Sequence, residues 1–196
     1  EEGSRAERGP IAGRSAASEG LRRRVHELAA SLSPVLFTGE AGSGRRYAAQ
    51  SLHALSQEKA AFVVVPSVDR EALDAALTEG GGTVFLAPLE QLAWPAQEEL
   101  AAALSDTRAR PRVVASTALD PHRAVDEGRL SPALVAAFGD SIVRVPSLRE
   151  RRVDVAVLVR TFVEELRRLN RLPPLAAIIL PACCLRLAVW IAPRRC

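Results

Sequence analysis

The sequence predicts an α/β fold, a five-stranded parallel sheet with helices on both faces. The first observation is that short apolar runs of strand-forming residues alternate with stretches of helical periodicity, as they do in buried parallel sheets. The second is a glycine-rich loop that follows directly on the first apolar run. Because such sheets bind ligands at the carboxyl ends of their strands, this loop is the expected ligand site.

Composition limits the class of protein but does not identify a partner. The 196 residues are enough for one medium domain, or for one domain and part of another, and with 48% of them apolar a substantial core is possible. The net charge of +3 is mild and Lys59 is the only lysine, so charge does not indicate a nucleic-acid or membrane surface. Cys183, Cys184 and Cys196 match neither a disulfide framework nor a zinc pattern, and we expect reduced thiols in a cytoplasmic protein. With no initiator methionine and no signal-peptide pattern, the chain is expected to be an excised segment or a processed product.

The first elements are a helix, a strand and a second helix. Helical periodicity from Leu21 to Ala30 indicates the first helix, which Ser15 or Ser18 can cap. The apolar run from Pro34 to Thr38 predicts the first strand. A helix from Tyr47 to about Ser56 is expected after the glycine loop.

Strands and helices continue to alternate up to about residue 150. Further strands are expected at 61–66, 83–87, 112–117 and 141–145, and helices at 70–77, 96–104 and 132–138. The run at 61–66 is apolar throughout and predicts a buried strand. From Arg151 the pattern is purely helical and predicts an amphipathic helix that ends near Asn170. Its apolar face is formed by Val153, Val155, Leu158, Val159, Phe162 and Leu166.

The loop after the first strand has the shape of a phosphate-binding loop but altered chemistry. Gly39 and Gly44 fall at the glycine positions of the pattern G-x-x-x-x-G-K-[ST], and such glycines let backbone N–H groups surround phosphate oxygens. Arg45 stands in place of the lysine, and Arg46 in place of the hydroxyl residue that holds magnesium. A tight strand-to-helix turn without a ligand is the alternative interpretation. The candidate nucleotide-binding residues are Gly39, Glu40, Ala41, Gly42, Ser43, Gly44, Arg45 and Arg46.

Several short strings follow one another in a specific order. They are A-G-R-S at 12–15, L-F-T-G-E-A-G-S-G at 36–44, G-G-T-V-F-L at 81–86, V-V-A-S-T at 113–117 and P-S-L-R-E-R at 146–151. In this order they resemble the AAA+ domain of bacterial enhancer-binding proteins, the ATPases that activate RNA polymerase carrying sigma-54. The resemblance implies a P-loop NTPase core with three αβα layers and a helical lid, truncated here.

The resemblance also implies a division of the chain. Residues 1–10 are expected to be a disordered lead-in, 11–149 the AAA+ core, and 150–172 the start of the helical lid. Residues 173–196 form an atypical hydrophobic tail without the lid motif of the family. A membrane helix is disfavoured there because Pro181 and Arg186 interrupt the apolar run. A native helix that packs on the core or a partner remains an alternative, and a lid sequence read out of frame is favoured.

The departures from the family fall on its catalytic acids. After G-G-T-L-F-L the family has Asp-Glu, which hold magnesium and the attacking water, and this chain has Ala87 and Pro88. Glu90 lies past the end of the strand, and we rank it low as a substitute. Magnesium is therefore not expected to be held by protein ligands.

The arginine fingers of the family are also missing. Alignment places Ser131 and Ala137 at the finger positions, and Arg129 lies one place out of register. Thr117 is at the sensor strand, but the residue after it is Ala118 instead of a polar residue. These changes indicate that hydrolysis is lost.

The loop that grips sigma-54 is absent as well. The family carries it in a long insertion, but here only residues 67–79 separate Pro66 from Gly80. We therefore expect a degenerate module in bacterial transcription control that binds ATP or ADP without hydrolysis and does not grip sigma-54. Its expected partners are other AAA+ subunits or a flanking regulatory or DNA-binding domain. The alternatives are a working ATPase with non-standard catalytic residues and a decayed or frameshifted gene product.

Overall fold

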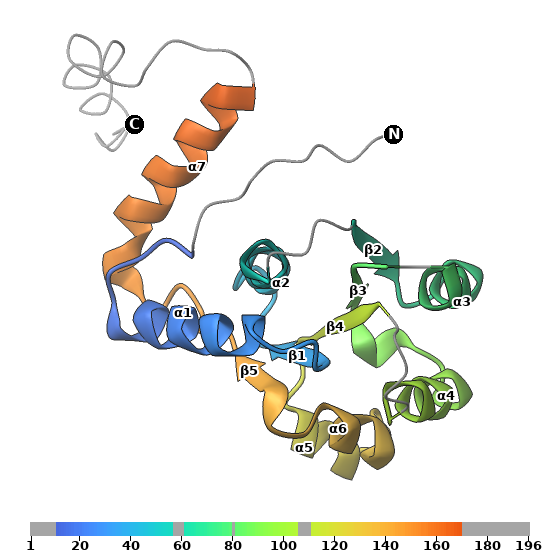
Figure 1. Cartoon of the computed structure of the whole chain (residues 1–196). Coiled ribbons are helices and arrows are strands. Elements are labelled where there is room, and N and C mark those ends of the chain that lie inside the picture. The colour runs from blue at the N-terminus through green and yellow to red at the C-terminus, as the bar shows by residue number, and fades with distance from the viewer. Residues whose placement is uncertain (1–10, 57–60, 80, 106–110, 170–196) are drawn as a thin grey trace, which may run out of the picture.

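The computed structural model describes residues 11–56, 61–79, 81–105 and 111–169 (Figure 1). Its centre is one five-stranded sheet in the order β2-β3-β4-β1-β5, with every neighbouring pair parallel. The strands are β1 (Val35–Thr38), β2 (Phe62–Pro66), β3 (Thr83–Ala87), β4 (Arg112–Thr117) and β5 (Ile142–Arg144). The predicted α/β fold class with a five-stranded parallel sheet is confirmed.

Helices cover both faces of this sheet. They are α1 (Ala16–Ala29), α2 (Arg45–Leu55), α3 (Arg70–Glu79), α4 (Trp94–Ser105), α5 (Pro121–Asp126), α6 (Pro132–Phe138) and α7 (Val155–Leu169), with 3-10 turns η1 (Leu89–Gln91), η2 (Gly139–Ser141) and η3 (Arg152–Asp154). Because successive strand residues point to opposite faces, Val35 and Phe37 pack with residues of α1 and α2, whereas Leu36 packs with residues of α3, α4 and α6. The result is a three-layer αβα arrangement.

Local capping explains where several helices begin. Ser15 caps α1 by accepting a hydrogen bond from the Ser18 backbone, so the helix begins before the predicted Leu21. Gly44, with a φ of 95°, allows α2 to begin at Arg45 instead of Tyr47. The sequence analysis missed α5, which Asp120 caps and which is too short to show helical periodicity.

The second strand is not buried as predicted. β2 lies at the edge of the sheet and pairs with β3 alone among the described strands. Val63 and Val64 are consequently 41% and 40% exposed, and only Val65 is fully buried. An apolar run predicts a strand, but it does not reveal whether the strand is central or at an edge.

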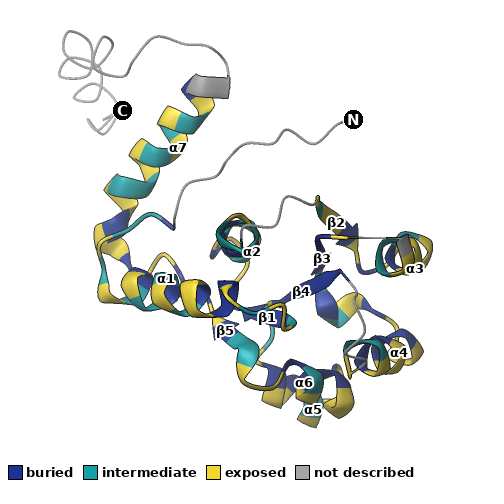
Figure 2. Ribbon diagram, viewed as in Figure 1, coloured by how far each residue is buried: buried dark blue, intermediate teal, exposed yellow. Residues whose placement is uncertain are grey.

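The last described helix projects away from the sheet (Figure 1). α7 confirms the predicted amphipathic helix from Val155 onward, but Val153 lies in η3 and is largely exposed, so it is not part of the helix. Much of the apolar side of α7 is itself exposed, as Figure 2 shows. The expected lead-in at 1–10 and tail at 173–196 lie outside the described residues.

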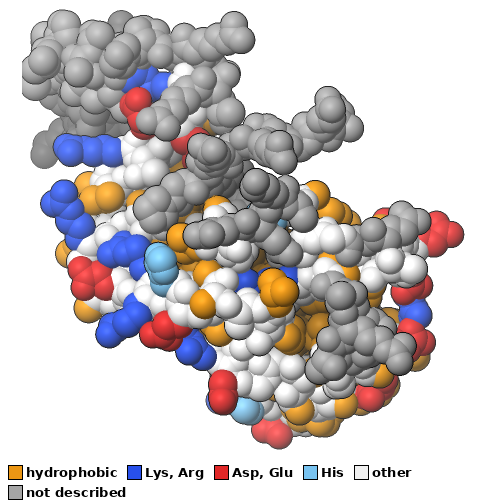
Figure 3. Space-filling model, viewed as in Figure 1, with side chains coloured by type: hydrophobic (Ala, Val, Ile, Leu, Met, Phe, Trp, Pro, Cys, Tyr) orange, Lys and Arg blue, Asp and Glu red, His pale blue; other side chains and the backbone are white. Residues whose placement is uncertain are grey.

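Two surface features bear on partners. On the face shown in Figure 3, basic and acidic side chains are interspersed near α1, which agrees with the mild net charge. None of the described helices is long and apolar enough to cross a membrane.

Candidate nucleotide-binding site

The glycine loop joins the carboxyl end of β1 to the start of α2. Gly39 has a φ of 147°, and a Cβ there would lie 2.6 Å from the carbonyl oxygen of Val145, so the close approach to this residue, which directly follows β5, requires glycine. The Ser43 backbone N–H donates to the carbonyl of Glu40 at 3.1 Å, which closes the turn. No side chain caps α2 at Gly44, so the N–H groups of its first turn are left for another acceptor.

The predicted loop residues lie together at this edge of the sheet. Most of the loop from Glu40 to Gly44 is exposed, and Ser43 is buried. Glu40 accepts a hydrogen bond from the Arg149 guanidinium at 2.6 Å, so its carboxylate is already paired. Arg45 is half-buried, whereas Arg46 is exposed. The loop therefore offers backbone N–H groups and one partly desolvated guanidinium to an anion.

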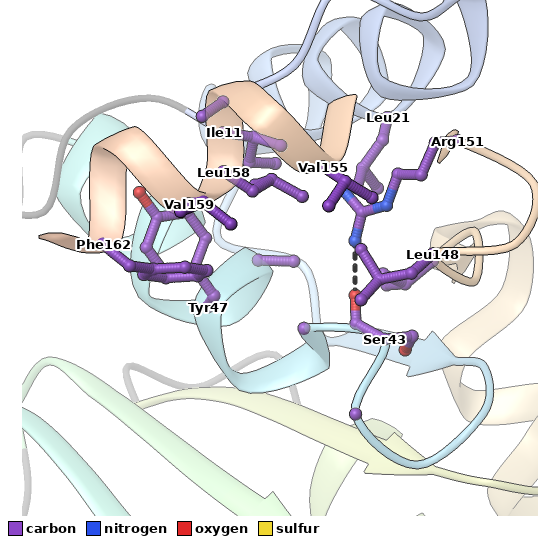
Figure 4. Close-up of a pocket in the computed structure, with 15 residues that line it drawn as sticks. Ile11, Leu21, Ser43, Tyr47, Leu148, Arg151, Val155, Leu158, Val159 and Phe162 are labelled. Carbon is purple, nitrogen blue, oxygen red and sulfur yellow. Dashed lines mark hydrogen bonds between the residues drawn. The ribbon is translucent and has the colours of Figure 1, made fainter. Parts of the chain in front are cut away.

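Arg151 is a second cation behind the loop, and the sequence analysis did not identify it as a site residue. Its Nη2 donates to the carbonyl oxygen of Ser43 at 2.7 Å, and the side chain is buried (Figure 4). Burial lowers the pKa of Arg151, and the negative charge of Asp154 offsets part of this effect. In the sequence, the position of Arg151 inside the motif P-S-L-R-E-R was the only feature that could have indicated a role at this site.

Asp154 ties the start of α1 to the chain that follows the sheet. The carboxylate is fully buried and accepts hydrogen bonds from the backbone N–H groups of Arg14 and Ser15, at 2.6 and 2.8 Å. The hydroxyls of Ser15 and Ser18 donate to its other oxygen. Burial opposes ionisation of Asp154, but these hydrogen bonds prevail and hold its pKa well below the usual range.

An apolar cavity of about 260 Å³ adjoins the loop (Figure 4). Gly42, Ser43 and Gly44 line one side of it, and side chains from α2 and α7 line another. Tyr47 of α2 meets Phe162 of α7 edge to face, with ring centroids 6.3 Å apart. The cavity has the apolar walls that suit a flat ring, and it opens onto the glycine loop.

The carboxyl ends of β3 and β4 lie beside the loop and carry few reactive groups. Ala87 ends β3, and Pro88 follows it. Thr117, which the sequence analysis placed on the sensor strand, accepts a hydrogen bond through its hydroxyl from the Leu119 backbone N–H at 3.1 Å, so this side chain is engaged locally. Glu90 on η1 is a reactive group near these strand ends. Its Oε1 accepts a hydrogen bond from the backbone N–H of Ala118, which follows β4, at 3.1 Å.

Glu90 also acts on Arg45 electrostatically. Burial lowers the pKa of Arg45, and the charge of Glu90 opposes that shift. The 3-10 turn that follows β3 brings this carboxylate back over the end of β4.

The two residues that the sequence analysis placed at arginine-finger positions do not line the cavity. Ser131 is buried and caps α6, with its hydroxyl bonded to Glu98 and its backbone N–H to Gln97 Oε1 at 2.7 Å. Ala137 lies in the last turn of α6. Among the residues that the structure describes, no cluster of three His, Cys, Asp or Glu side chains is arranged to hold a metal ion.

Similarity to known proteins is extensive along the chain. A model of the sigma-54 interaction domain matches residues 12–148. The C4-dicarboxylate transport transcriptional regulatory protein DctD of Pseudomonas aeruginosa is 29% identical over 192 aligned residues, covering 80% of this chain and 41% of DctD. The DNA-binding transcriptional regulator NtrC of Rhizobium meliloti is 25% identical, covering 80% of this chain and 39% of NtrC. The chain thus spans about two fifths of the length of these curated relatives.

Solved structures share the fold. NtrX from Brucella abortus, crystallised in complex with ADP, superposes with a TM-score of 0.66 at 24% identity, covering 80% of this chain and 42% of NtrX. The P-loop NTPase domain of a sigma-54 transport activator from E. coli superposes with a TM-score of 0.60 at 21% identity. That match covers 69% of this chain and 99% of the domain.

Proposed function

The chain belongs to the sigma-54 interaction domain family of bacterial transcriptional regulators, and from that premise we propose that it binds ATP or ADP without hydrolysing it. The family resemblance drawn from the motifs is confirmed by this match. One observation carries the proposal: the apolar cavity and the glycine loop are continuous, since Gly42, Ser43 and Gly44 belong to the loop and also line the cavity. A nucleotide requires this pairing of a pocket for a ring with a cradle for phosphates.

The phosphate contacts are supplied by the loop and by arginine. The backbone N–H groups between Gly39 and Gly44 and the first turn of α2 provide donors together with the positive end of the helix dipole. Arg45 adds a charged donor, although its planar fork differs in geometry from the ammonium of lysine. Arg151 fixes the loop from behind through the carbonyl of Ser43.

Hydrolysis is not expected, because each catalytic side chain of the family is replaced in this chain by a residue that cannot do its task. Arg46 and Ala87 cannot hold magnesium, and Pro88 cannot orient a water. Ser131 and Ala137 cannot supply a finger to a neighbouring subunit. Since phosphoryl transfer depends on positioning and charge neutralisation, losing these groups together leaves binding without turnover.

The role that follows is regulatory. Residues Arg70–Glu79 form helix α3 between β2 and β3, in the stretch where the family carries the sigma-54 contact loop. We therefore propose that the domain does not grip sigma-54. It associates with other AAA+ subunits or with a flanking regulatory or DNA-binding domain.

A working ATPase with non-standard residues is the alternative that one observation favours. Glu90 places a carboxylate beside the loop, held by the Ala118 N–H, where an acid could orient a water. Against this alternative, the pair Arg46 and Ala87 offers no ligand for the metal that normally accompanies such an acid.

A titration with and without magnesium tests the proposal. Isothermal titration calorimetry of the chain with ADP should give a saturable one-site isotherm. Magnesium should change the affinity less than about threefold, because the part of the chain that the structure describes contains no cluster of side chains arranged to hold the ion. The absence of binding at millimolar ADP would overturn the proposal, and a large gain on adding magnesium would favour the ATPase alternative.

A further inference from the structure

We propose that Arg22 is a positioning residue for the ring of the bound nucleotide, because it holds the short segment that forms one wall of the apolar cavity. The inference rests on the proposed nucleotide binding and deepens it, since it assigns the ring and the phosphates to parts of the site that are supported separately. Arg22 is not among the residues that line the cavity, so it acts on a ligand through the segment that it holds.

The segment that forms this wall lies outside regular secondary structure. Residues 11–14 precede α1 and belong to neither a helix nor a strand. Ile11 is buried, and Ile11 and Ala12 line the cavity together with residues of α2 and α7 (Figure 4). Because no helix or sheet ladder fixes the backbone here, other groups have to satisfy its polar atoms and hold it in place.

Arg22 holds the segment by its carbonyl groups. Its Nη1 donates to the carbonyl oxygen of Ile11 at 2.8 Å and to that of Gly13 at 2.7 Å. Hydrogen bonds from a charged donor are stronger than those between neutral groups. Arg22 lies on α1, whose buried face packs with β1 in the core. The cavity wall is therefore tied to a helix that the core already fixes.

Asp154 holds the next residues by their N–H groups. Its carboxylate accepts from the backbone of Arg14 and of Ser15. Gly13, with a φ of 137°, lies between the two anchors, and a Cβ there would lie 2.7 Å from an oxygen of Asp154. Asp154 thus fixes the end of the segment nearest α1, and Arg22 fixes the end that lines the cavity.

The glycine loop is held by different contacts. Arg151 donates to the carbonyl of Ser43, and Gly39 packs against the carbonyl of Val145. Neither of the two hydrogen bonds from Arg22 to the wall segment reaches this loop. Loss of the Arg22 guanidinium should therefore weaken contacts to the ring and leave the cradle for phosphates in place.

The test compares ADP with inorganic pyrophosphate, which has phosphates but no ring, by calorimetry on the whole chain in buffer that contains EDTA. The wild-type chain should bind both, and ADP about tenfold more tightly, because only ADP places a ring in the cavity. Arg22→Ala should weaken ADP about tenfold, since the wall is no longer held ready for the ring, and should change pyrophosphate less than about twofold.

Arg23→Ala is the matched control, because it removes the same charge from the neighbouring, exposed position of α1. It should change neither affinity more than about twofold. Arg22→Lys keeps the charge and can still donate to one carbonyl, so it should weaken ADP about threefold and leave pyrophosphate unchanged. This variant decides the matter if Arg22→Ala does not fold.

The outcomes separate this inference from the proposed function. If the Arg22 variants weaken ADP and pyrophosphate alike, or weaken neither, the inference is overturned and nucleotide binding stands. An ADP affinity in the wild-type chain no greater than that for pyrophosphate, or binding of ADP without pyrophosphate, would also overturn it, because the ring and the phosphates would not be held separately. A wild-type chain that binds neither probe would overturn the proposed function and this inference with it.

Discussion

The two halves of the candidate site differ in how completely they are built. On one side, the glycine loop, the apolar cavity and the buried Asp154 network form a continuous and hydrogen-bonded structure. On the other side, the ends of β3 and β4 and the start of α6 present Ala87, Pro88 and Ser131, and we propose that these stand in place of the catalytic side chains of the family.

This difference teaches that binding and hydrolysis depend on different properties of the same fold. The binding half depends on backbone geometry and packing, which the core needs in any case. The hydrolytic half depends on a few side-chain functional groups that the fold does not need. The second half can therefore be lost while the first remains.

The largest expected effect comes from breaking the network that supports the binding half. Asp154→Ala removes the acceptor of four hydrogen bonds and leaves buried donors unsatisfied, so it should lower the free energy of unfolding by about 3 kcal/mol. Urea denaturation followed by circular dichroism measures this. Asp126→Ala, at an exposed position, should stay within about 0.5 kcal/mol of wild type.

The same network predicts a dependence of stability on pH. Because the folded-state pKa of Asp154 is lowered, its contribution is fully present above the ordinary aspartate pKa of about 3.9 and is lost as pH falls from there through the folded-state pKa. The wild-type chain should lose more stability than Asp154→Ala between pH 5 and about pH 2.5. Parallel stability curves for the two chains in that range would contradict the assignment.

A smaller effect should follow from distorting the loop. Gly39→Ala places a Cβ against the carbonyl of Val145 in a strained backbone conformation, and should cost about 2 kcal/mol of stability and most of the ADP affinity. Gly20→Ala is the control, because a Cβ there meets nothing within 4 Å and the residue is helical. It should leave ADP binding unchanged and stabilise the fold slightly.

ADP affinity should depend less on the charge of Arg45 at the end of the loop than on the backbone shape of the loop. Arg45→Ala removes one charged donor but leaves the backbone cradle, so ADP affinity should fall about tenfold. Arg23→Ala on the exposed face of α1 removes the same charge elsewhere and should change the affinity less than about twofold. Equal losses of ADP affinity in both variants would show that the affinity depends on the net charge of the chain and not on the position of Arg45.

The smallest effect is expected from restoring catalytic residues. The triple variant Arg45→Lys, Ala87→Asp, Pro88→Glu should leave sigma-54-dependent transcription at background, because residues 67–79, most of which form α3, are proposed to lack the contact loop. Open-complex formation by this variant in a purified transcription assay would refute the claim.

Sequence reasoning recovered the parts of the molecule that are local. The five strands and the glycine loop were predicted because apolar runs and glycine spacing are properties of neighbouring residues. The exposure of Val63 and the wall that Phe162 contributes to the cavity depend on how distant elements pack, and no local pattern carries that information. Glu90 was ranked low because it lies past the strand end, and only the turn η1 brings it beside the loop.

The most direct test of the central claim is phosphate release. The wild-type chain at high concentration, incubated with ATP and magnesium for hours, should release no more phosphate than Arg45→Ala under the same conditions. Binding without turnover requires this result together with a measurable ADP affinity. Release by the wild-type chain above that of Arg45→Ala would contradict the account and identify the domain as a working ATPase.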